Sequence, residues 1–386
     1  MADQNSILDK IIESQERQQA ASFNPNELIA SLLKNISAKE SDILSRRFGL
    51  LGKKKETLED IGKYYEITRE RIRQIETATI KKLRDLKDFR QQLDLAKHHV
   101  GNLLENYGGV MEENFLLNEI GSHKSNQENY AAALFILNHL LNDRIESVKA
   151  DPELLNGWKL PSASLDLIKQ VVKELVNVIK KEEKLLKAEE LIDGFKQSDF
   201  YANHKEQIAA LKLGASEETL EQEIDRIIDS YLKISRQTDQ NILGEWGLSH
   251  WHTVSPKRMS DKIYLVLRKL GKPIHFTEIT DLINQSKFDK KVAYPATIHN
   301  ELILDDRYVL VGRGIYALKE WGYQTGTVMD IIVDILKKAN KPLTKEEIIE
   351  AVLAQRLVRK STIYLALTNK DKIKKLPDNG YTLIDR

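Results

Sequence analysis

The sequence predicts a mainly helical protein with small β-hairpins, in which a helix-turn-helix module precedes tandem winged-helix repeats. Two observations lead to this prediction. Residues 37–90 carry capped, amphipathic helical patterns joined by short turns. Downstream, a six-residue pattern of apolar, three mostly polar, Glu or Asn, and apolar residues recurs. Its four copies are VMEENF from Val110, LKAEEL from Leu186, IHFTEI from Ile274 and LTKEEI from Leu343.

Composition narrows the class of protein. The chain has 386 residues, of which 41% are apolar and 30% charged, and it contains no cysteine. No run reaches the roughly 18 to 20 apolar residues that a membrane helix needs, and the polar start MADQNSILDK lacks a signal-peptide pattern. Without cysteine there are no disulfides, zinc ribbons or thiol nucleophiles. We expect a cytoplasmic, nucleoid-associated protein that contacts no membrane.

Charge is distributed unevenly along the chain. The net charge is only +1, but residues 37–90 hold fifteen Lys and Arg against ten Asp and Glu. Residues 181–230, by contrast, are rich in Glu and Asp. The basic segment is the part in which an anionic partner such as nucleic acid is expected.

The first part of the chain divides at clear helix signals. Residues 1–36 read as a helical extension of two short helices, separated by FNPNE at Phe23. Ser37 and Glu40 form a capping box, and the helix they begin is expected to end at Gly49. Thr57 can cap a further helix, and the third helix is expected to start at about Thr68. Three helices with short turns make a compact module at 37–90.

The four pattern copies mark four winged-helix-like repeats, at residues 91–162, 163–255, 256–323 and 324–386. In the third repeat, RYVLVGRGIYAL contains two β-like runs joined at Gly312-Arg313-Gly314, which is a hairpin signal. Helix, short strand, helix, helix and hairpin is the winged-helix order. Each repeat closes with an aromatic-x-Leu strand, and the aromatic side chain is expected in the core. These aromatics are Trp158, Trp246, Tyr316 and Tyr381.

The third helix of the 37–90 module has the residues of a DNA-reading helix. In a helix-turn-helix, the second helix of the motif enters the major groove and its first residues reach base edges. Arg69 and Arg73 lie four apart, as do Glu70 and Gln74, so the four share one surface. Arg suits guanine, Gln suits adenine and Glu suits cytosine. The alternative is a solvated helix face on which Glu70 and Arg73 pair with each other.

This module closely resembles region four of the primary-family sigma factors of RNA polymerase. The similar segments are ISAKESDILSRRFGL from Ile36 and TLEDIGKYYEITRERIRQIETATIKKLRDL from Thr57, with the core TRERIRQIE intact. The resemblance implies reading of a promoter −35 element through Arg69, Glu70, Arg73 and Gln74. It implies phosphate contacts from Arg71, Lys81, Lys82 and Arg84. It also implies that the helix around Leu44 and Phe48 offers a surface to the flap of the polymerase β subunit.

A sigma factor also needs region two, the aromatic-rich domain that melts promoters. Only about 36 residues precede the match, and no similar Trp/Tyr-rich basic helix follows it. We therefore expect that the chain does not open promoters as a conventional sigma factor does.

The third repeat brings a second resemblance. RKLGKPIHFTEITDLI and YPATIHNELILDDRYVLVGRGIYALKEWGY, within residues 259–323, are similar to the HARE-type winged helix shared with the delta subunit of bacterial RNA polymerase. Its expected recognition helix, 295–304, lacks Lys and Arg, so a protein contact is as plausible there as DNA, with Thr297, His299 and Asn300 facing outward. DNA contacts in the winged helices are expected from Arg313, Arg356, Arg359 and Lys360.

Enzyme motifs are missing from the sequence. There is no phosphate-binding G-x-x-x-x-G-K-[ST], no H-E-x-x-H and no G-x-S-x-G. His250 and His252 have no third metal ligand at a defined spacing, and Asp305-Asp306 lacks the other residues of a nuclease site. We expect no catalytic residues, cofactor or metal, and hold a nucleic-acid enzyme as the remotest hypothesis.

The sequence supports two hypotheses about function. The first is a bacterial transcription factor that binds double-stranded DNA at a −35-like element and contacts RNA polymerase. The alternative is a delta-like adaptor that associates with RNA polymerase mainly through protein contacts.

Overall fold

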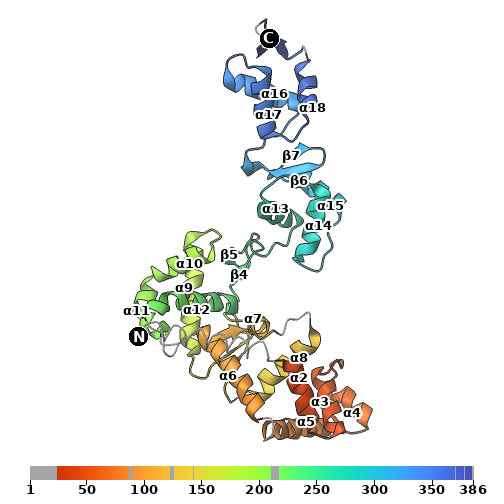
Figure 1. Cartoon of the computed structure of the whole chain (residues 1–386), viewed down its shortest axis with the longest axis vertical. Coiled ribbons are helices and arrows are strands. Elements are labelled where there is room, and N and C mark those ends of the chain that lie inside the picture. Colours follow the sequence, from red (N-terminus) through yellow and green to blue (C-terminus); the bar gives the residue numbers. More distant parts are fainter. Residues whose placement is uncertain are drawn as a thin grey trace, which may run out of the picture. The chain divides into compact units, whose positions relative to one another are not determined.

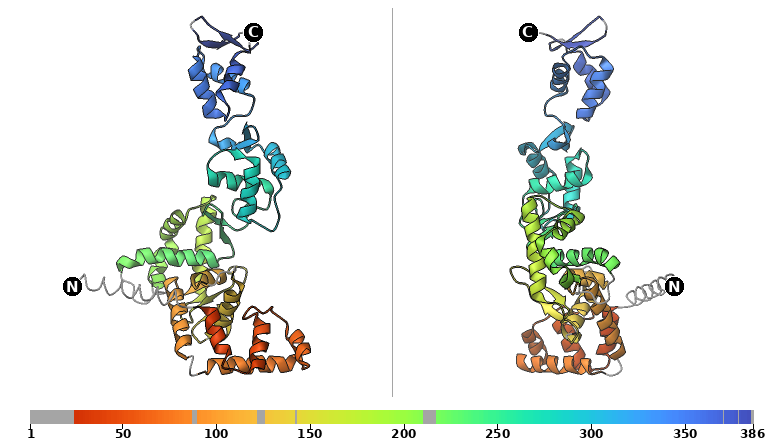
Figure 2. Two further views of the ribbon diagram at one scale, coloured as in Figure 1. Left: turned by 45° about the vertical axis from the view of Figure 1, so that its right-hand side comes forward. Right: turned by 90° about the vertical axis from the view of Figure 1, so that its left-hand side faces the viewer.

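The structure is a computed structural model that describes residues 24–86, 90–121, 126–141, 143–209, 217–369, 371–377 and 379–384. It is mainly helical with small antiparallel sheets, which confirms the predicted fold class (Figure 1, Figure 2). The first expected helix of the N-terminal extension lies outside the described residues. Within them, no helix combines the length and apolar character needed to cross a membrane. The chain forms two compact units, Met1–Asp239 and Gln240–Arg386.

From residue 24 on, the described part of the first unit begins with four helices, and the predicted caps are found at the helix that starts after Ser37. Ser37 accepts a hydrogen bond from the Glu40 backbone N–H at 3.3 Å, and the Glu40 carboxylate accepts one from the Ser37 N–H at 2.9 Å. The helix they begin ends before Gly49, which is left-handed with φ of 70°. The capping box and the stop are therefore confirmed. The helices are α2 (Pro25–Leu33), α3 (Ala38–Phe48), α4 (Leu58–Tyr65) and α5 (Arg69–Arg84).

The next elements have winged-helix order. The sheet order is β1-β3-β2, so the strand after the first helix lies beside the last strand of the hairpin. Trp158 on β3 is buried, as expected of a closing aromatic. The elements are α6 (Arg90–Asn106), β1 (Val110–Glu112), α7 (Glu113–Glu119), α8 (Gln127–Phe135), the π-helix η2 (Ile136–Leu140), β2 (Glu146–Val148) and β3 (Gly157–Lys159).

One hydrophobic core joins the helix-turn-helix to this first repeat. It runs without interruption from Leu32 on α2 and Leu83 on α5 to Phe135 on α8 and Trp158 on β3. A smaller cluster of Ile43, Ile61 and Ile72, with flanking apolar residues, lies within the helix-turn-helix. The module is therefore built into the first unit and not merely tethered to it.

The rest of the first unit is helical and packs back on β1. Tyr231 is fully buried, and its hydroxyl donates to the Gly108 carbonyl oxygen at 2.8 Å. The Ser230 hydroxyl donates to the Val110 carbonyl oxygen at 2.6 Å. The helices are α9 (Leu165–Glu182), α10 (Ala188–Lys196), α11 (Asp199–Ala209) and α12 (Glu217–Ile234). At the boundary with the second unit follow β4 (Thr238–Gln240) and β5 (Trp246–Leu248), which form a two-stranded sheet.

The second unit repeats the winged-helix order most completely. Its three-stranded sheet has the order β6-β8-β7, the same arrangement as in the first repeat. Tyr316 on β8 is buried in the core, as predicted. The elements are α13 (Met259–Leu270), β6 (Ile274–His275), α14 (Phe276–Ser286), α15 (Pro295–Leu304), β7 (Tyr308–Gly312), β8 (Ile315–Leu318) and the 3-10 helix η3 (Lys319–Trp321).

The fourth repeat is a reduced version of the same fold. Its first strand is a single β-bridge between Leu343 and Tyr381, because only those two residues pair there. Tyr381 is half-buried, unlike the other closing aromatics. The elements are α16 (Val328–Ala339), α17 (Lys345–Gln355), α18 (Lys360–Leu367), β9 (Ile373–Lys375) and β10 (Tyr381–Leu383).

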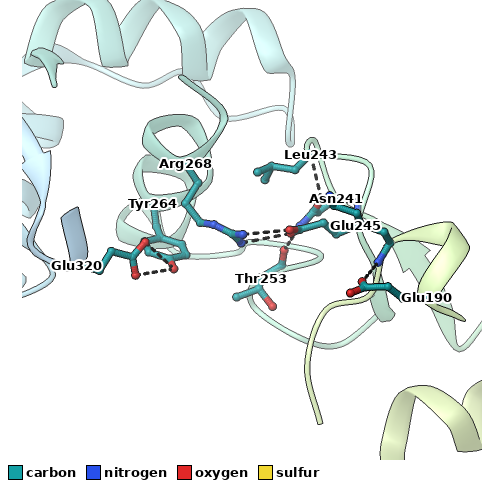
Figure 3. Close-up of polar contacts among 9 residues, drawn as sticks. Glu190, Asn241, Leu243, Glu245, Thr253, Tyr264, Arg268 and Glu320 are labelled. Carbon is teal, nitrogen blue, oxygen red and sulfur yellow. Dashed lines mark hydrogen bonds and ion pairs between the residues drawn. The ribbon is translucent and has the colours of Figure 1, made fainter. Parts of the chain in front are cut away.

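Polar contacts fix the start of the second unit against α13 (Figure 3). Arg268 donates two hydrogen bonds to the Glu245 carboxylate at 3.0 and 3.2 Å. Asn241 donates to the same carboxylate at 3.0 Å and to the Thr253 carbonyl oxygen at 3.1 Å. The β4–β5 turn thus has a defined place on the third repeat. Nearby, His252 lies 3.8 Å from the Asp261 carboxylate, and the described residues include no group of three or more ligand-type side chains suited to a metal.

Candidate nucleic-acid interface

The position of α5 is set by a tight turn after α4. Glu66 ends α4 in the left-handed conformation with φ of 55°. Gly62 allows the following turn to approach, because an ideal Cβ there would lie 2.8 Å from the Ile67 carbonyl oxygen. The Thr68 hydroxyl then accepts from the Arg71 N–H at 3.2 Å and caps α5. Since Ile72 is fully buried against Ile43 and Ile61, the opposite side of α5 faces outward.

The four predicted base-reading residues are all exposed on that outward side. Arg73 donates to both Glu70 carboxylate oxygens, at 2.9 and 2.6 Å, and each side chain remains 58% exposed. Beside this pair, Arg71 donates to the Gln74 side-chain oxygen at 3.1 Å. The hydrogen bond from Arg73 holds the pKa of the Glu70 carboxyl below its usual value. The local pairing weighed from the sequence is therefore present, and it occurs on an accessible face.

This arrangement leaves the side chains available to a ligand. Exposed ion pairs contribute little to stability, because water screens them and both side chains lose freedom. Arg69 is exposed as well, and it makes no ion pair with any carboxylate in the described ranges. The outward face of α5 can therefore exchange its internal hydrogen bonds for contacts with base edges.

The predicted phosphate-contacting residues differ in their surroundings. Lys81 is exposed, and Lys82 is exposed but lies 3.3 Å from a Glu40 carboxylate oxygen. Arg84 donates from Nε to the His139 carbonyl oxygen at 2.6 Å, so it anchors the end of α5 to η2. Sequence spacing gave no signal for that contact, because the two residues are 55 positions apart.

The surface expected for the polymerase flap is covered by the chain itself. Leu44 is fully buried in the shared core, so it cannot contact a partner in this conformation. Phe48 is half-buried, with its ring 4.9 Å from that of Phe135 and 4.8 Å from that of His139. The expectation that Leu44 is offered to a partner is therefore wrong for this conformation, and the Phe48 ring packs against α8 and η2.

Asp42 is a structural residue of this module that the sequence analysis missed. Its carboxylate accepts from Arg46 Nε at 2.7 Å and from the Tyr65 hydroxyl at 2.6 Å, and it also pairs with Lys53. Burial raises the pKa of the Asp42 carboxyl, but hydrogen bonds from Lys53, Tyr65 and Arg46 outweigh it and hold the pKa well below the usual range. Burial and the bond to Asp42 raise the pKa of Tyr65 to about 12.

The depressed pKa of Asp42 predicts acid sensitivity of the first unit. The pKa of Asp42 in the folded protein lies below the unfolded value of about 3.9. The contribution of its carboxylate to the stability of the fold is therefore complete above about pH 4 and is lost as the pH falls through the folded pKa. We expect Asp42→Asn to melt at a lower temperature than the natural protein at pH 7, and the difference to shrink toward pH 2. Thermal melts followed by circular dichroism at several pH values test this, and parallel pH profiles would contradict it.

The winged-helix residues predicted to contact DNA all lie in the second unit. Arg313, Arg359 and Lys360 are exposed. Arg356 is half-buried, its Nη1 is buried with no hydrogen-bond partner among the described residues, and burial lowers the pKa of its guanidinium. On α15, Thr297 and Asn300 face outward as expected, whereas the half-buried His299 ring lies 4.9 Å from that of Phe276.

A comparison with known protein families bears on the helix-turn-helix alone. The matched segment begins in α2, contains α3 and α4, and ends just after α5. This supports a DNA-binding, transcription-related function for that part of the first unit. By this comparison, residues 32–85 are similar to the family described as sigma-70, region 4.

Proposed function

We propose that the chain is a transcription factor that reads a −35-like promoter element with α5. The observation that carries the proposal is the exposed face of that helix, where two arginines, a glutamate and a glutamine meet on a capped helix-turn-helix. These side-chain types match guanine, cytosine and adenine edges in the major groove. The family match at residues 32–85 supports the same reading.

The pairs within α5 suggest how binding proceeds. Arg73 exchanges its two hydrogen bonds to Glu70 for two to a guanine, and the released carboxylate can accept from a cytosine amino group. Gln74 leaves Arg71 in the same way and turns to an adenine, while Arg71 turns to phosphate. Lys81 and Lys82, further along α5, complete the phosphate contacts. Each internal bond lost is replaced by a contact with DNA.

The proposal is tested by fluorescence anisotropy of the full chain on a duplex carrying TTGACA and on a scrambled duplex. The titrations are run across a salt series, because phosphate contacts alone weaken steeply as salt rises. We expect the preference for TTGACA to persist at high salt. Binding that is blind to sequence and vanishes with salt would reject base reading by α5.

A second function, a delta-like adaptor on RNA polymerase, is favoured by the surface of α15. This helix has no Lys or Arg, and it exposes Ile303 and Leu304, the latter to 81%. Large apolar side chains at this exposure are typical of a protein-binding surface. The resemblance of the third repeat to HARE-type domains points the same way. Since Leu44 and Phe48 are covered, polymerase contact in this proposal runs through α15.

Co-purification with core RNA polymerase after nuclease treatment tests the adaptor function. We expect Leu304→Glu to lose the association, because a charge placed in an apolar contact is not solvated there. Leu270→Glu is the control, as Leu270 is a less exposed leucine at the end of α13. An absence of association in the natural protein, or equal loss in both variants, would count against this function.

A further inference from the structure

The third and fourth repeats are joined by a backbone contact that was not expected from the sequence. Strand β7 is the edge of its sheet, in the order β6-β8-β7. One backbone hydrogen bond links this strand to the extended segment after α17: the Leu357 N–H donates to the Val311 carbonyl oxygen at 3.0 Å. Arg356 is fully extended at this point, with φ of −156° and ψ of 142°. The segment is therefore hydrogen-bonded to the edge strand of the neighbouring repeat at this one point.

Gly312 makes this close approach possible. An ideal Cβ on Gly312 would lie 3.1 Å from the Leu357 carbonyl oxygen and 3.3 Å from the Ile315 side chain. Contacts of that length are tight, so a larger residue would push the segment away from β7. On the hairpin, Val309, Val311 and Ala317 form a small buried cluster. The hairpin is thus packed within the third repeat and hydrogen-bonded to the segment after α17.

The contact brings cations of two repeats together. Arg313 follows Gly312 in the turn of the β7–β8 hairpin, and Arg359 and Lys360 follow Leu357 at the start of α18. Arg313 and Arg359 each lie two residues from the hydrogen-bonded pair Val311 and Leu357, so their Cα atoms are no more than roughly 22 Å apart. All three side chains are exposed. Arg356, which directly precedes Leu357 and is half-buried, adds a fourth positive charge close to the junction.

We propose that the β7–β8 wing of the third repeat and the start of α18 in the fourth repeat form one surface that binds the phosphates of duplex DNA. About thirteen phosphate charges occur in roughly 22 Å of duplex, so the separation of the cations suits one DNA segment. The surface belongs to the second unit and does not include α5. Through this surface the chain binds DNA independently of its base sequence, separately from base reading by α5.

The test uses the full chain on a scrambled duplex, with affinity measured across a salt series. Arg313→Glu and Arg359→Glu should each weaken binding and lower the slope of log affinity against log salt by about 0.9, the value for one phosphate contact. Lys269→Glu is the matched control, because Lys269 is an exposed cation on α13 of the same unit. We expect it to leave the slope unchanged. A slope unchanged by Arg313→Glu, or changed equally by Lys269→Glu, would overturn the proposal.

A second variant tests whether the two repeats act together. Leu357→Pro removes the N–H that bonds to Val311 while keeping every charge, and the extended Arg356 is compatible with a following proline. We expect it to weaken binding to scrambled DNA about as much as Arg313→Glu, with the melting temperature used to confirm folding. Natural affinity in a folded Leu357→Pro variant would overturn the joint surface.

These results are distinguishable from failure of base reading by α5. Variants of the second unit should change affinity for TTGACA and scrambled duplexes by the same factor, so the preference ratio stays constant. If the ratio changed with Arg313→Glu, the wing would be reading sequence, and the proposed phosphate surface would be wrong. Loss of the ratio in α5 variants alone would leave the second-unit surface unaffected.

Discussion

Replacing Arg73 by Ala should weaken binding to the preferred −35-like duplex by about 1 to 3 kcal/mol, roughly a 5- to 150-fold loss. A bidentate contact from Arg to guanine is worth this much in discrimination, because the wrong base leaves donors unpaired. The substitution also removes the arginine that donates two hydrogen bonds to the Glu70 carboxylate. Affinity for the preferred duplex should therefore fall more than affinity for scrambled DNA, as measured by anisotropy.

Lys82→Ala provides the comparison on the same helix. Lys82 is exposed, and its 3.3 Å contact with Glu40 links α5 to α3. As a phosphate-contacting residue it should weaken binding to all duplexes alike and lower the salt slope by about 1. Equal losses on preferred and scrambled duplexes for Arg73→Ala would mean that Arg73 also contacts only phosphate.

Glu70→Gln separates the two interpretations of the pair on α5. If Glu70 serves only to hold Arg73 through their two hydrogen bonds, losing its charge should leave the base preference unchanged. If Glu70 accepts from a cytosine, the preference should relax at that one base pair. Titrations against duplexes substituted at single positions distinguish these outcomes, and an unchanged profile at every position would assign Glu70 to the supporting role.

Local features of the helix-turn-helix could be predicted from the sequence because each depends on neighbouring residues. The capping box of Ser37 and Glu40 and the stop at Gly49 involve side chains within one helical turn. The outward face of α5 follows from its 3.6-residue period, which buries Ile72 and exposes Arg73. The closing aromatics Trp158 and Tyr316 were correctly expected in the core because they recur at the same place, the last strand, of a repeated pattern.

The features that the sequence did not predict all depend on which surfaces meet. Periodicity marks α3 as having an apolar side, yet it does not say that Phe135 and His139 cover Phe48. The contact of Arg84 with the His139 carbonyl oxygen joins residues from separate elements. Likewise, an arginine-rich segment near Leu357 gives no hint that its backbone pairs with β7. Charge and hydrophobic periodicity are properties of a single helix or strand. These contacts, by contrast, form only when elements that are distant in the sequence pack together.

Replacing Phe135 by Ala should destabilise the first unit by about 3 to 5 kcal/mol, because it leaves a large cavity in a core that is close-packed. Phe135 is 2% exposed and contacts Phe48 of the helix-turn-helix. Leu95→Ala is the control, since Leu95 lies on α6 of the same unit but is 53% exposed. It should change the free energy of unfolding by no more than about 0.5 kcal/mol. Urea unfolding followed by circular dichroism gives both values.

The effect of Phe135→Ala should reach α5, although Phe135 lies outside the segment that resembles region four. Since one core runs from α2 and α5 to Trp158, the helix-turn-helix and the first repeat should unfold in one transition. The cavity would then lower DNA binding at temperatures where the unit begins to melt, without altering base preference while it is folded. If a separate helix-turn-helix transition kept its midpoint in Phe135→Ala, the shared core would not couple the two parts. The module would then be an independent domain whose α3 surface becomes free when the first repeat unfolds.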